Sequence, residues 1–310
     1  MCSRYFEPLL FLLIVSLKMS LSKHETRPLG AHMSIAGGHF RAVENAVAVK
    51  ATALQIFTRN QRQWSAQPLT DEEVEQFRTA FNESGLRFLC SHASYLLNLA
   101  SGKPESRERS IKALRAELER SEALGCRCVV VHPGSHLGDG VDIGVRRVAE
   151  AVQQLLKETS GFSVGIALEN TAGQGNMLGG NVAELAEIAK FANFPDRLGV
   201  CLDTAHAFGA GVDLRSSQKV REWAKNVDDR IGRDRVWVLH LNDTICKCGS
   251  KRDQHTHIGK GEIGTAGFAN VLGEPLFHGI PGIIETPKDK KDELKFDRLN
   301  LRRLRSLVDC

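Results

Sequence analysis

The sequence predicts a (β/α)8 barrel, in which eight parallel strands close on themselves inside a ring of helices. Eight short apolar runs are spread between residues 29 and 284, and helical patterns fall between most of them. No Pro-, Ser- or Gly-rich linker divides the chain into two domains. Strands that alternate with helices in this way favour a barrel, with an open doubly wound sheet as the alternative. A barrel also predicts that the chemistry lies where the strands end and the following loops begin.

Each predicted strand is a short apolar run of four to six residues, the length expected of a strand. The predicted strands are 29–33, 53–57, 86–90, 128–131, 164–168, 198–202, 236–241 and 280–284.

The predicted helices repeat their apolar residues at helical spacing. The helix over 71–84 has a start signal, because Thr70 with Glu73 three residues later forms a capping box. Within 106–124, Ile111, Leu114 and Leu118 fall on one face. The remaining predicted helices are 145–157, 182–192 and 291–308.

The composition is that of an ordinary globular protein, with 42% hydrophobic and 25% charged residues in 310. The formal net charge of +4 permits a polyanionic partner without requiring one. Basic residues concentrate at 247–260, where Asp253 is the single acid. By itself this segment fits a solvated loop equally well.

The N-terminus is predicted to lie outside the fold, so that residues 1–28 form an extension and 29–310 the domain. The apolar run 9–17 is too short to span a membrane and has the size of a signal-peptide core, and an organelle presequence is the alternative. The chain has eight cysteines and does not need a disulfide framework at this length. We interpret most of them as reduced and structural, which indicates a reducing compartment.

Polar side chains of one kind follow six consecutive predicted strands, from the third to the eighth. These histidines and carboxylates, with those of the loops that follow, are His92, His132, Glu169, Asp203, His206, His240, Asp253, His255 and Glu285. A single polar residue at a strand end is usually a cap or a loop hydrogen-bonder. Six such strands are hard to explain by capping. His24, His32, His39, His136, His257 and His278 are expected to be structural.

Metal ions explain this set best, because carboxylates packed together without cations would repel one another. Imidazole and carboxylate without thiolate suit Zn²⁺, Mn²⁺ or Fe²⁺. Nine ligands exceed what one tetrahedral ion uses, so two or three ions are predicted. Clustered ions are a recurring device for phosphodiester hydrolysis.

These residues stand in segments that resemble the endonuclease IV-type apurinic/apyrimidinic endonucleases. The resemblance runs from about Gly30 beyond Glu285. The matching segments are GAHMSIAGG (30–38), FTRNQRQW (57–64), SHASYLLNL (91–99), VHPGSHLG (131–138), LENTAGQGNMLG (168–179), GVCLDTAHAFGAG (199–211), HLND (240–243), KRDQHTHIGKGEIG (251–264) and IIET (283–286).

The resemblance implies a TIM barrel that holds three zinc ions. His92, His132 and Glu169 would bind the first ion. Glu169 would bridge to the second, which also takes Asp203, His240 and Glu285, and His206, Asp253 and His255 would hold the third. The implied reaction is hydrolysis of the phosphodiester 5′ to an abasic site in base excision repair, leaving a 3′-hydroxyl, with 3′-end cleaning as a further activity. Glu169 and Glu285 would be the catalytic carboxylates.

The resemblance also implies DNA contacts from two loops, because the family bends DNA and extrudes the abasic nucleotide. The residues concerned are Asn60, Gln61, Arg62, Gln63, Tyr95 and Leu96. A polar loop anchored by Trp64 is what these residues would suggest without the family. The sequence departs from the family pattern at Ala93, Gln254, Thr256 and Lys260, the last replacing a common glutamate.

Two other functions are compatible with parts of the pattern. A sugar isomerase or epimerase would use Glu169, Asp203, His240 and Glu285 but has no need of His206, Asp253 and His255. A non-catalytic protein that binds damaged DNA would tolerate the loss of metal-ligand residues, and the sequence shows no such loss. The nuclease is the favoured prediction, acting as a monomer on damaged double-stranded DNA in the nucleus, a mitochondrion or a plastid, without a nucleotide cofactor or a membrane.

Overall fold

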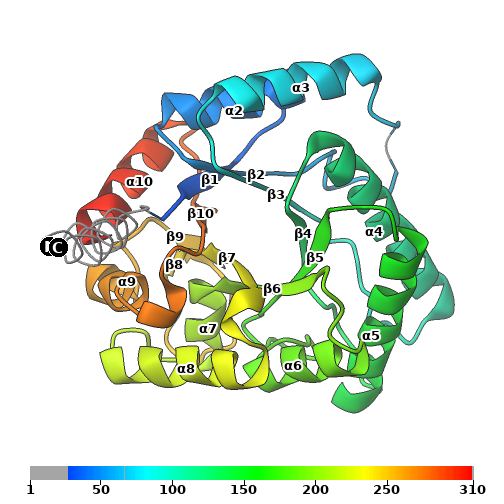
Figure 1. The fold of residues 1–310 in the computed structure, drawn as a ribbon. Helices are drawn as coiled ribbons and strands as arrows, with labels where there is room; N and C mark the ends of the chain where they lie inside the picture. The colour runs from blue at the N-terminus through cyan, green and yellow to red at the C-terminus, as the bar shows by residue number, and fades with distance from the viewer. Residues whose placement is uncertain (1–26, 66, 309–310) are drawn as a thin grey trace, which may run out of the picture.

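The structure is a computed structural model that describes residues 27–65 and 67–308. The predicted targeting run 9–17 lies outside the described residues. Eight parallel strands form a closed barrel, viewed along its axis in Figure 1. Their order around the barrel is β1-β10-β7-β6-β5-β4-β3-β2, so the first strand pairs with the last. The closed ring confirms the predicted (β/α)8 barrel and rules out the open sheet.

The strands begin and end within about two residues of the predicted ones. They are β1 (Leu29–Met33), β2 (Ala53–Ile56), β3 (Phe88–His92), β4 (Cys128–Val131), β5 (Gly165–Glu169), β6 (Leu198–Asp203), β7 (Val236–His240) and β10 (Gly282–Ile284). A separate two-stranded antiparallel ribbon, β8 (Asp243–Thr244) and β9 (His255–Thr256), follows β7 and was not predicted.

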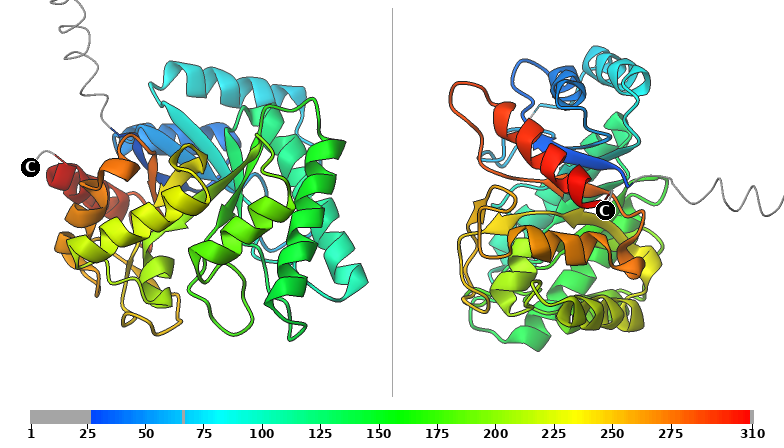
Figure 2. Two further views of the ribbon diagram at one scale, coloured as in Figure 1. Left: turned by 60° about the horizontal axis from the view of Figure 1, so that its bottom comes forward. Right: turned by 90° about the vertical axis from the view of Figure 1, so that its left-hand side faces the viewer.

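Helices surround the barrel, as the two side views of Figure 2 show. They are α2 (His39–Ala48), α3 (Asp71–Glu83), α4 (Pro104–Leu124), α5 (Val141–Glu158), α6 (Val182–Phe191), α7 (Thr204–Ala210), α8 (Ser217–Arg230), α9 (Gly264–Leu272) and α10 (Lys295–Val308). Among the described residues no helix is both long and apolar enough to span a membrane.

The last helix starts four residues later than the predicted 291–308. The carboxylate of Asp289 accepts hydrogen bonds from the backbone N–H groups of Lys291 and Asp292, at 2.8 and 3.1 Å. This side chain bends the backbone into a turn, and a helix cannot pass through it.

The barrel interior is filled by small and medium side chains below the strand ends. Cys90, Cys128 and Cys201 pack there with Trp237, and all four are buried. The six described cysteines are free thiols. Gly30 in β1 has no room for a side chain, because a Cβ would lie 1.7 Å from the carbonyl oxygen of Ala53 on β2. The core is therefore closely packed directly beneath the site.

The predicted capping box at the start of α3 is present. Thr70 Oγ1 accepts from the N–H of Glu73 at 3.2 Å, and Glu73 Oε2 accepts from the N–H of Thr70 at 2.9 Å. We expect Thr70→Ala to lower the free energy of unfolding by about 1 kcal/mol, since one helix N–H loses its partner. Urea denaturation measures this. Thr79→Ala, in the middle of the same helix, is the control and should not destabilise the protein.

Candidate metal centre

The nine predicted ligands converge at one end of the barrel. His92, Glu169, Asp203 and His240 are the last residues of their strands, and His132 and Glu285 follow theirs directly. The other three come from the segments after β6 and β7: His206 from α7, Asp253 from the loop that joins β8 to β9, and His255 from β9. Parallel strands all end at the same face of a barrel, so side chains far apart in sequence meet there.

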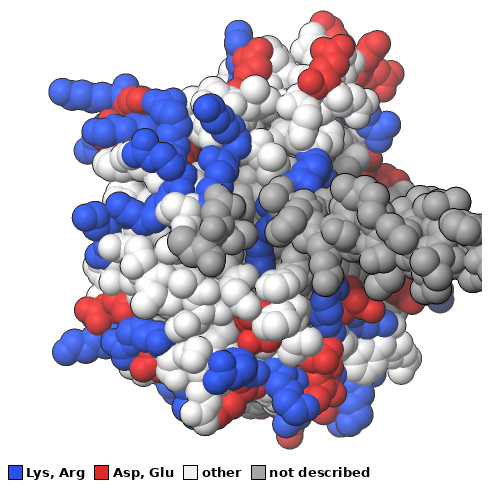
Figure 3. Space-filling view, turned by 60° about the vertical axis from the view of Figure 1, so that its left-hand side comes forward, with Lys and Arg blue, Asp and Glu red and all other residues white. Residues whose placement is uncertain are grey.

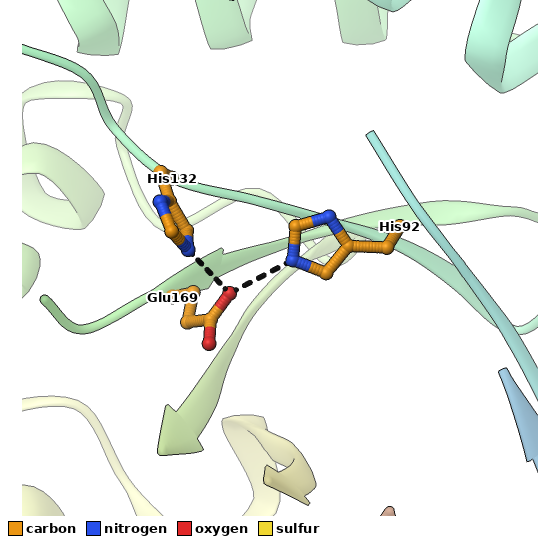
Figure 4. A group of neighbouring side chains, drawn as sticks. All are labelled: His92, His132 and Glu169. Carbon is orange, nitrogen blue, oxygen red and sulfur yellow. Dashed lines mark hydrogen bonds and ion pairs between the residues drawn. The ribbon is translucent and has the colours of Figure 1, made fainter. Parts of the chain in front are cut away.

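Glu169 contacts four histidines of the cluster, and Figure 4 shows its carboxylate facing two of them, His92 and His132. Its Oε2 lies 3.0 Å from His92 Nε2 and 2.9 Å from His132 Nε2. Its Oε1 lies 2.9 Å from His240 Nδ1 and 3.4 Å from His206 Nδ1. One buried carboxylate thus faces four imidazoles.

Three groups made only of histidine and carboxylate donors have a geometry that could hold metal ions, each with its atoms within 4.8 Å of one another. They are His92 with His132 and Glu169; Glu169 with Asp203, His240 and Glu285; and Asp203 with His206 and His255. Because Glu169 and Asp203 each belong to two groups, the three groups form one continuous cluster.

Asp253 completes the third group. Its carboxylate oxygens lie 3.1 Å from His206 Nε2 and 3.0 Å from His255 Nε2. The structure therefore brings the nine predicted ligands together, although the third donor group contains Asp203, and Asp253 lies beside it.

The pKa values of the side chains in the cluster are shifted by the buried carboxylates. Burial alone would lower the pKa of His240, but Glu285 and Glu169 outweigh burial and raise that pKa to about 9. Burial also lowers the pKa of His255, but Asp253 and Asp203 outweigh burial and raise that pKa to about 9. Burial disfavours the charged form of Glu285, yet His240 and His32 hold the pKa of that carboxyl well below its usual range. Protons on the imidazoles balance carboxylate charge that metal ions would balance otherwise.

The chemistry of the donor set fits divalent metal ions. His255 Nε2 is buried and makes no well-directed hydrogen bond to a described residue, although Asp253 lies 3.0 Å away, as expected of a ligand atom aimed at an ion. Cys201 lies near Glu169 and His240, but burial raises the pKa of its thiol well above its usual value. It therefore stays protonated, and the donors that remain are imidazole and carboxylate, which suit Zn²⁺, Mn²⁺ or Fe²⁺.

Neutral side chains around the ligands fix their orientation. Gln55 on β2 accepts a hydrogen bond from His240 Nε2 at 2.8 Å and donates to Glu285 Oε1 at 2.7 Å. Asn242 donates to Asp203 Oδ2 at 2.7 Å and accepts from the N–H of Glu285, also at 2.7 Å. These contacts decide which ring nitrogen and which oxygen face the cluster.

Asn170 and the backbone of Ala93 have the same effect on two other ligands. The side-chain oxygen of Asn170 accepts from the N–H of Asp203 at 2.6 Å, and its carbonyl accepts from His206 Nδ1 at 2.8 Å. His92 Nδ1 donates to the carbonyl of Ala93 at 2.7 Å, which leaves Nε2 facing Glu169. The departure at Ala93 therefore leaves His92 oriented, because the backbone oxygen of that residue holds Nδ1.

Sequence reasoning missed these supporting residues. Asn170 directly follows the ligand Glu169, and Asn242 lies two residues after the ligand His240. These short distances in sequence could have identified both. Gln55 lies inside an apolar strand and gave no such signal. His32, expected to be structural, lies 3.6 Å from Glu285 and accepts from Gln55 at 3.0 Å, and it belongs to none of the donor groups.

The residues predicted to contact DNA lie on two loops at the same end of the barrel. Tyr95 is 62% exposed and Leu96 38%, although the Tyr95 ring packs 5.6 Å from that of His92. Arg62 is exposed, and its N–H donates to Asn60 Oδ1 at 2.9 Å. Ser94 donates to the carbonyl of Gln61 at 2.5 Å and so links the two loops. The exposed Tyr95 ring thus lies beside the cluster, and the loop that carries the exposed Arg62 is tied to the loop of Tyr95.

Comparison with known proteins gives a consistent result. Residues 43–306 match the model of the family described as "Xylose isomerase-like TIM barrel". The chain is 46% identical over 287 residues to the "Probable endonuclease 4" of Oleidesulfovibrio alaskensis, covering 93% of this chain and 97% of that protein. The solved structure of endonuclease IV from Thermus thermophilus is 36% identical with a TM-score of 0.79, covering 91% of this chain and 99% of that one. A D-tagatose 3-epimerase-like protein, 20% identical with a TM-score of 0.66 over 90% of this chain and 98% of its own, shares the fold alone.

Proposed function

The chain belongs to the endonuclease IV family of TIM-barrel hydrolases, and we propose that it cuts the DNA backbone on the 5′ side of abasic sites. The observation that carries this proposal is the continuous cluster of three donor groups at the end of the barrel. Three ions are the number that these groups suit, and Zn²⁺ is the ion that tetrahedral sets of imidazole and carboxylate favour. The product would carry a 3′-hydroxyl, as base excision repair requires.

Each group would have a distinct part in binding the ions. His92, His132 and Glu169 would hold one ion, and Glu169 would be shared with the ion of Asp203, His240 and Glu285. His206, Asp253 and His255 would hold the third. When bound, such ions supply an activated water and a stabilising charge for the leaving oxygen.

The protein's own side chains would position the ions and the DNA and would neutralise the charge of the ions. Glu169 and Asp203, each in two of the three groups, would each be shared between two ions and would offset the repulsion between them. Glu285 is held by Gln55 and Asn242, which keeps its carboxylate aimed at the centre. Tyr95 and Arg62 would fill the gap that an extruded abasic nucleotide leaves in the base stack. Selectivity would follow because a nucleotide without a base costs little to unstack.

A duplex with one tetrahydrofuran abasic analogue tests the proposal. The analogue cannot undergo β-elimination, so only hydrolysis cuts it. We expect cleavage on its 5′ side with a 3′-hydroxyl, and no cleavage of the same duplex with a normal nucleotide. If metal-loaded, folded protein leaves the analogue intact, the proposal is wrong.

A sugar isomerase or epimerase would need only the middle group of Glu169, Asp203, His240 and Glu285. The third group, to which the β8–β9 ribbon contributes His255 and its connecting loop adds Asp253, has no part in such a reaction. A metal content near three per chain would favour the nuclease, and a content near one the isomerase.

Metal affinity should depend steeply on pH. His240 and His255 have pKa values of about 9 in the metal-free protein, and an imidazole must lose its proton to bind an ion. As the pH rises toward 9 the two imidazoles lose these protons to the solvent, so the apparent affinity for metal should rise from about pH 6 to about pH 9. Titration of metal-free protein with Zn²⁺ in weakly buffered solution should also release protons. An affinity that is flat over this range would contradict the protonated state inferred for the two histidines.

A further inference from the structure

A hollow of about 470 Å³ lies beside the metal centre, between α10 and the turn that follows β9. Its lining includes two rings, an apolar side chain and three cations: His257, Phe296, Leu299, Lys260, Arg302 and Arg303. No Asp or Glu is among the described residues that line it. The rings of His257 and Phe296 pack against each other with their centres 4.1 Å apart and form one wall.

Two acids, one on α10 and one just before it, are paired with other cations. Both carboxylate oxygens of the buried Asp297 accept from Lys288 Nζ, at 2.7 and 2.6 Å. Asp292 pairs with Arg298 at 2.5 Å. Neither Lys260 nor Arg302 has an ion pair with a described residue, and both are exposed. Figure 3 views the molecule from the side of α10 and shows Lys and Arg side chains gathered at the upper left of this face.

The turn that carries Lys260 is held rigid from below. The buried carboxylate of Asp243 accepts hydrogen bonds from the N–H groups of Gly259, Gly261 and Ile263, at 2.8, 3.0 and 3.1 Å. A Cβ at Gly261 would lie 2.5 Å from an oxygen of that carboxylate, so the backbone there lies directly on Asp243. The backbone position of Lys260 is therefore fixed before any ligand arrives, which lowers the entropic cost of binding.

The hollow is joined to the metal centre through Asn300 on α10. Asn300 Nδ2 donates to Thr286 Oγ1 at 2.9 Å, and Thr286 directly follows Glu285. Asn300 Oδ1 accepts from the N–H of Ile258 at 3.2 Å, three residues after His255. All three residues are buried, so these bonds fix the floor of the hollow against the strand end and the ribbon that carry Glu285 and His255.

We propose that this hollow binds the sugar-phosphate backbone of the duplex that flanks the cleaved site. The inference rests on the proposed function, since it extends the same DNA interface. Exposed cations on a rigid turn and a helix suit phosphate oxygens, and the Phe296 and Leu299 side chains offer an apolar wall for a deoxyribose. An inorganic phosphate or a lipid headgroup has the same charge, but continuity with the metal centre favours a DNA strand that passes both.

The test compares the double variant Lys260→Ala/Arg302→Ala with wild type, using the full chain. Lys157→Glu is the matched control, because it also lowers the net charge by two and lies in the last turn of α5, at the opposite end of the barrel. Binding to an undamaged duplex is followed by fluorescence anisotropy at several salt concentrations, so it does not depend on cleavage. Steady-state cleavage of the tetrahydrofuran duplex supplies KM and kcat.

We expect the double variant to bind about tenfold more weakly near 0.1 M salt, and the slope of log K against log[salt] to fall by about 2, since each lost cation contributes about 0.9. KM should rise with kcat unchanged, and the difference in KM should vanish when the duplex is shortened on one flank and persist when it is shortened on the other. Lys157→Glu should change the slope by much less.

Equal slopes for the double variant and the control would overturn the proposal, as would a loss of binding to anionic lipid vesicles while DNA binding stays intact. If wild type does not cut the abasic duplex but the double variant still loses the salt-dependent binding, the proposed reaction fails and the DNA-binding hollow stands.

Discussion

We expect Glu169→Gln to abolish cleavage of abasic DNA and to strip the protein of metal. Glu169 faces His92, His132, His206 and His240, and it belongs to two of the three donor groups. Glutamine keeps the shape but removes the charge that would hold two ions close together. Metal ions contribute several kcal/mol to the transition state of such hydrolyses, so the rate should fall by about 10³-fold or more.

Metal content by mass spectrometry and single-turnover cleavage of the tetrahydrofuran duplex are the two measurements. Glu75→Gln, an exposed carboxylate on α3, is the matched control and should keep both metal and activity. The fold of the variant is checked by circular dichroism, because a buried neutral amide in this position could also affect stability. A folded Glu169→Gln protein with full metal and full activity would show that Glu169 does not bridge the ions.

The barrel and the ligand set could be predicted because both leave a local trace in the sequence. Strands buried in a parallel barrel are short apolar runs, and the site begins where each run ends in a histidine or carboxylate. His92, Glu169 and Asp203 could be placed by this rule alone, because each is the last residue of its strand. Their common location then follows from the parallel arrangement, without knowledge of any pair contact.

The supporting contacts could not be predicted in this way, because they depend on which strands become neighbours. Gln55 and Glu285 are 230 residues apart in the sequence. They meet because the barrel closes with β1 between β2, which carries Gln55, and β10, which Glu285 follows. The β8–β9 ribbon was also missed, since strands of two residues show no periodicity. The hollow beside α10 is a further case, because Lys260 and Arg302 come together only through tertiary packing.

Gln55→Leu should weaken metal binding by about 10- to 100-fold, the usual cost of losing a side chain that orients a ligand. Gln55 Oε1 accepts from His240 Nε2, which keeps a proton there and makes Nδ1, the nitrogen that faces Glu169 and Glu285, the one that would bind an ion after losing its proton. Its amide also donates to Glu285 Oε1. Leucine fills a similar volume but leaves the buried His240 Nε2 without a hydrogen-bond partner, at a cost of about 1–3 kcal/mol, and removes one of the partners of Glu285.

The metal dependence of activity separates an orienting role from a structural one. If Gln55 orients His240 and Glu285, the activity of Gln55→Leu should recover toward wild type at high Zn²⁺, since the ligands themselves remain. Gln218→Leu, at an exposed position on α8, should bind metal as wild type does. Gln55→Glu keeps an acceptor for His240 but places a second carboxylate next to Glu285. Because the two carboxylates repel each other, its metal affinity should stay below that of wild type. A Gln55→Leu protein with unchanged metal affinity would mean that packing alone fixes the His240 ring.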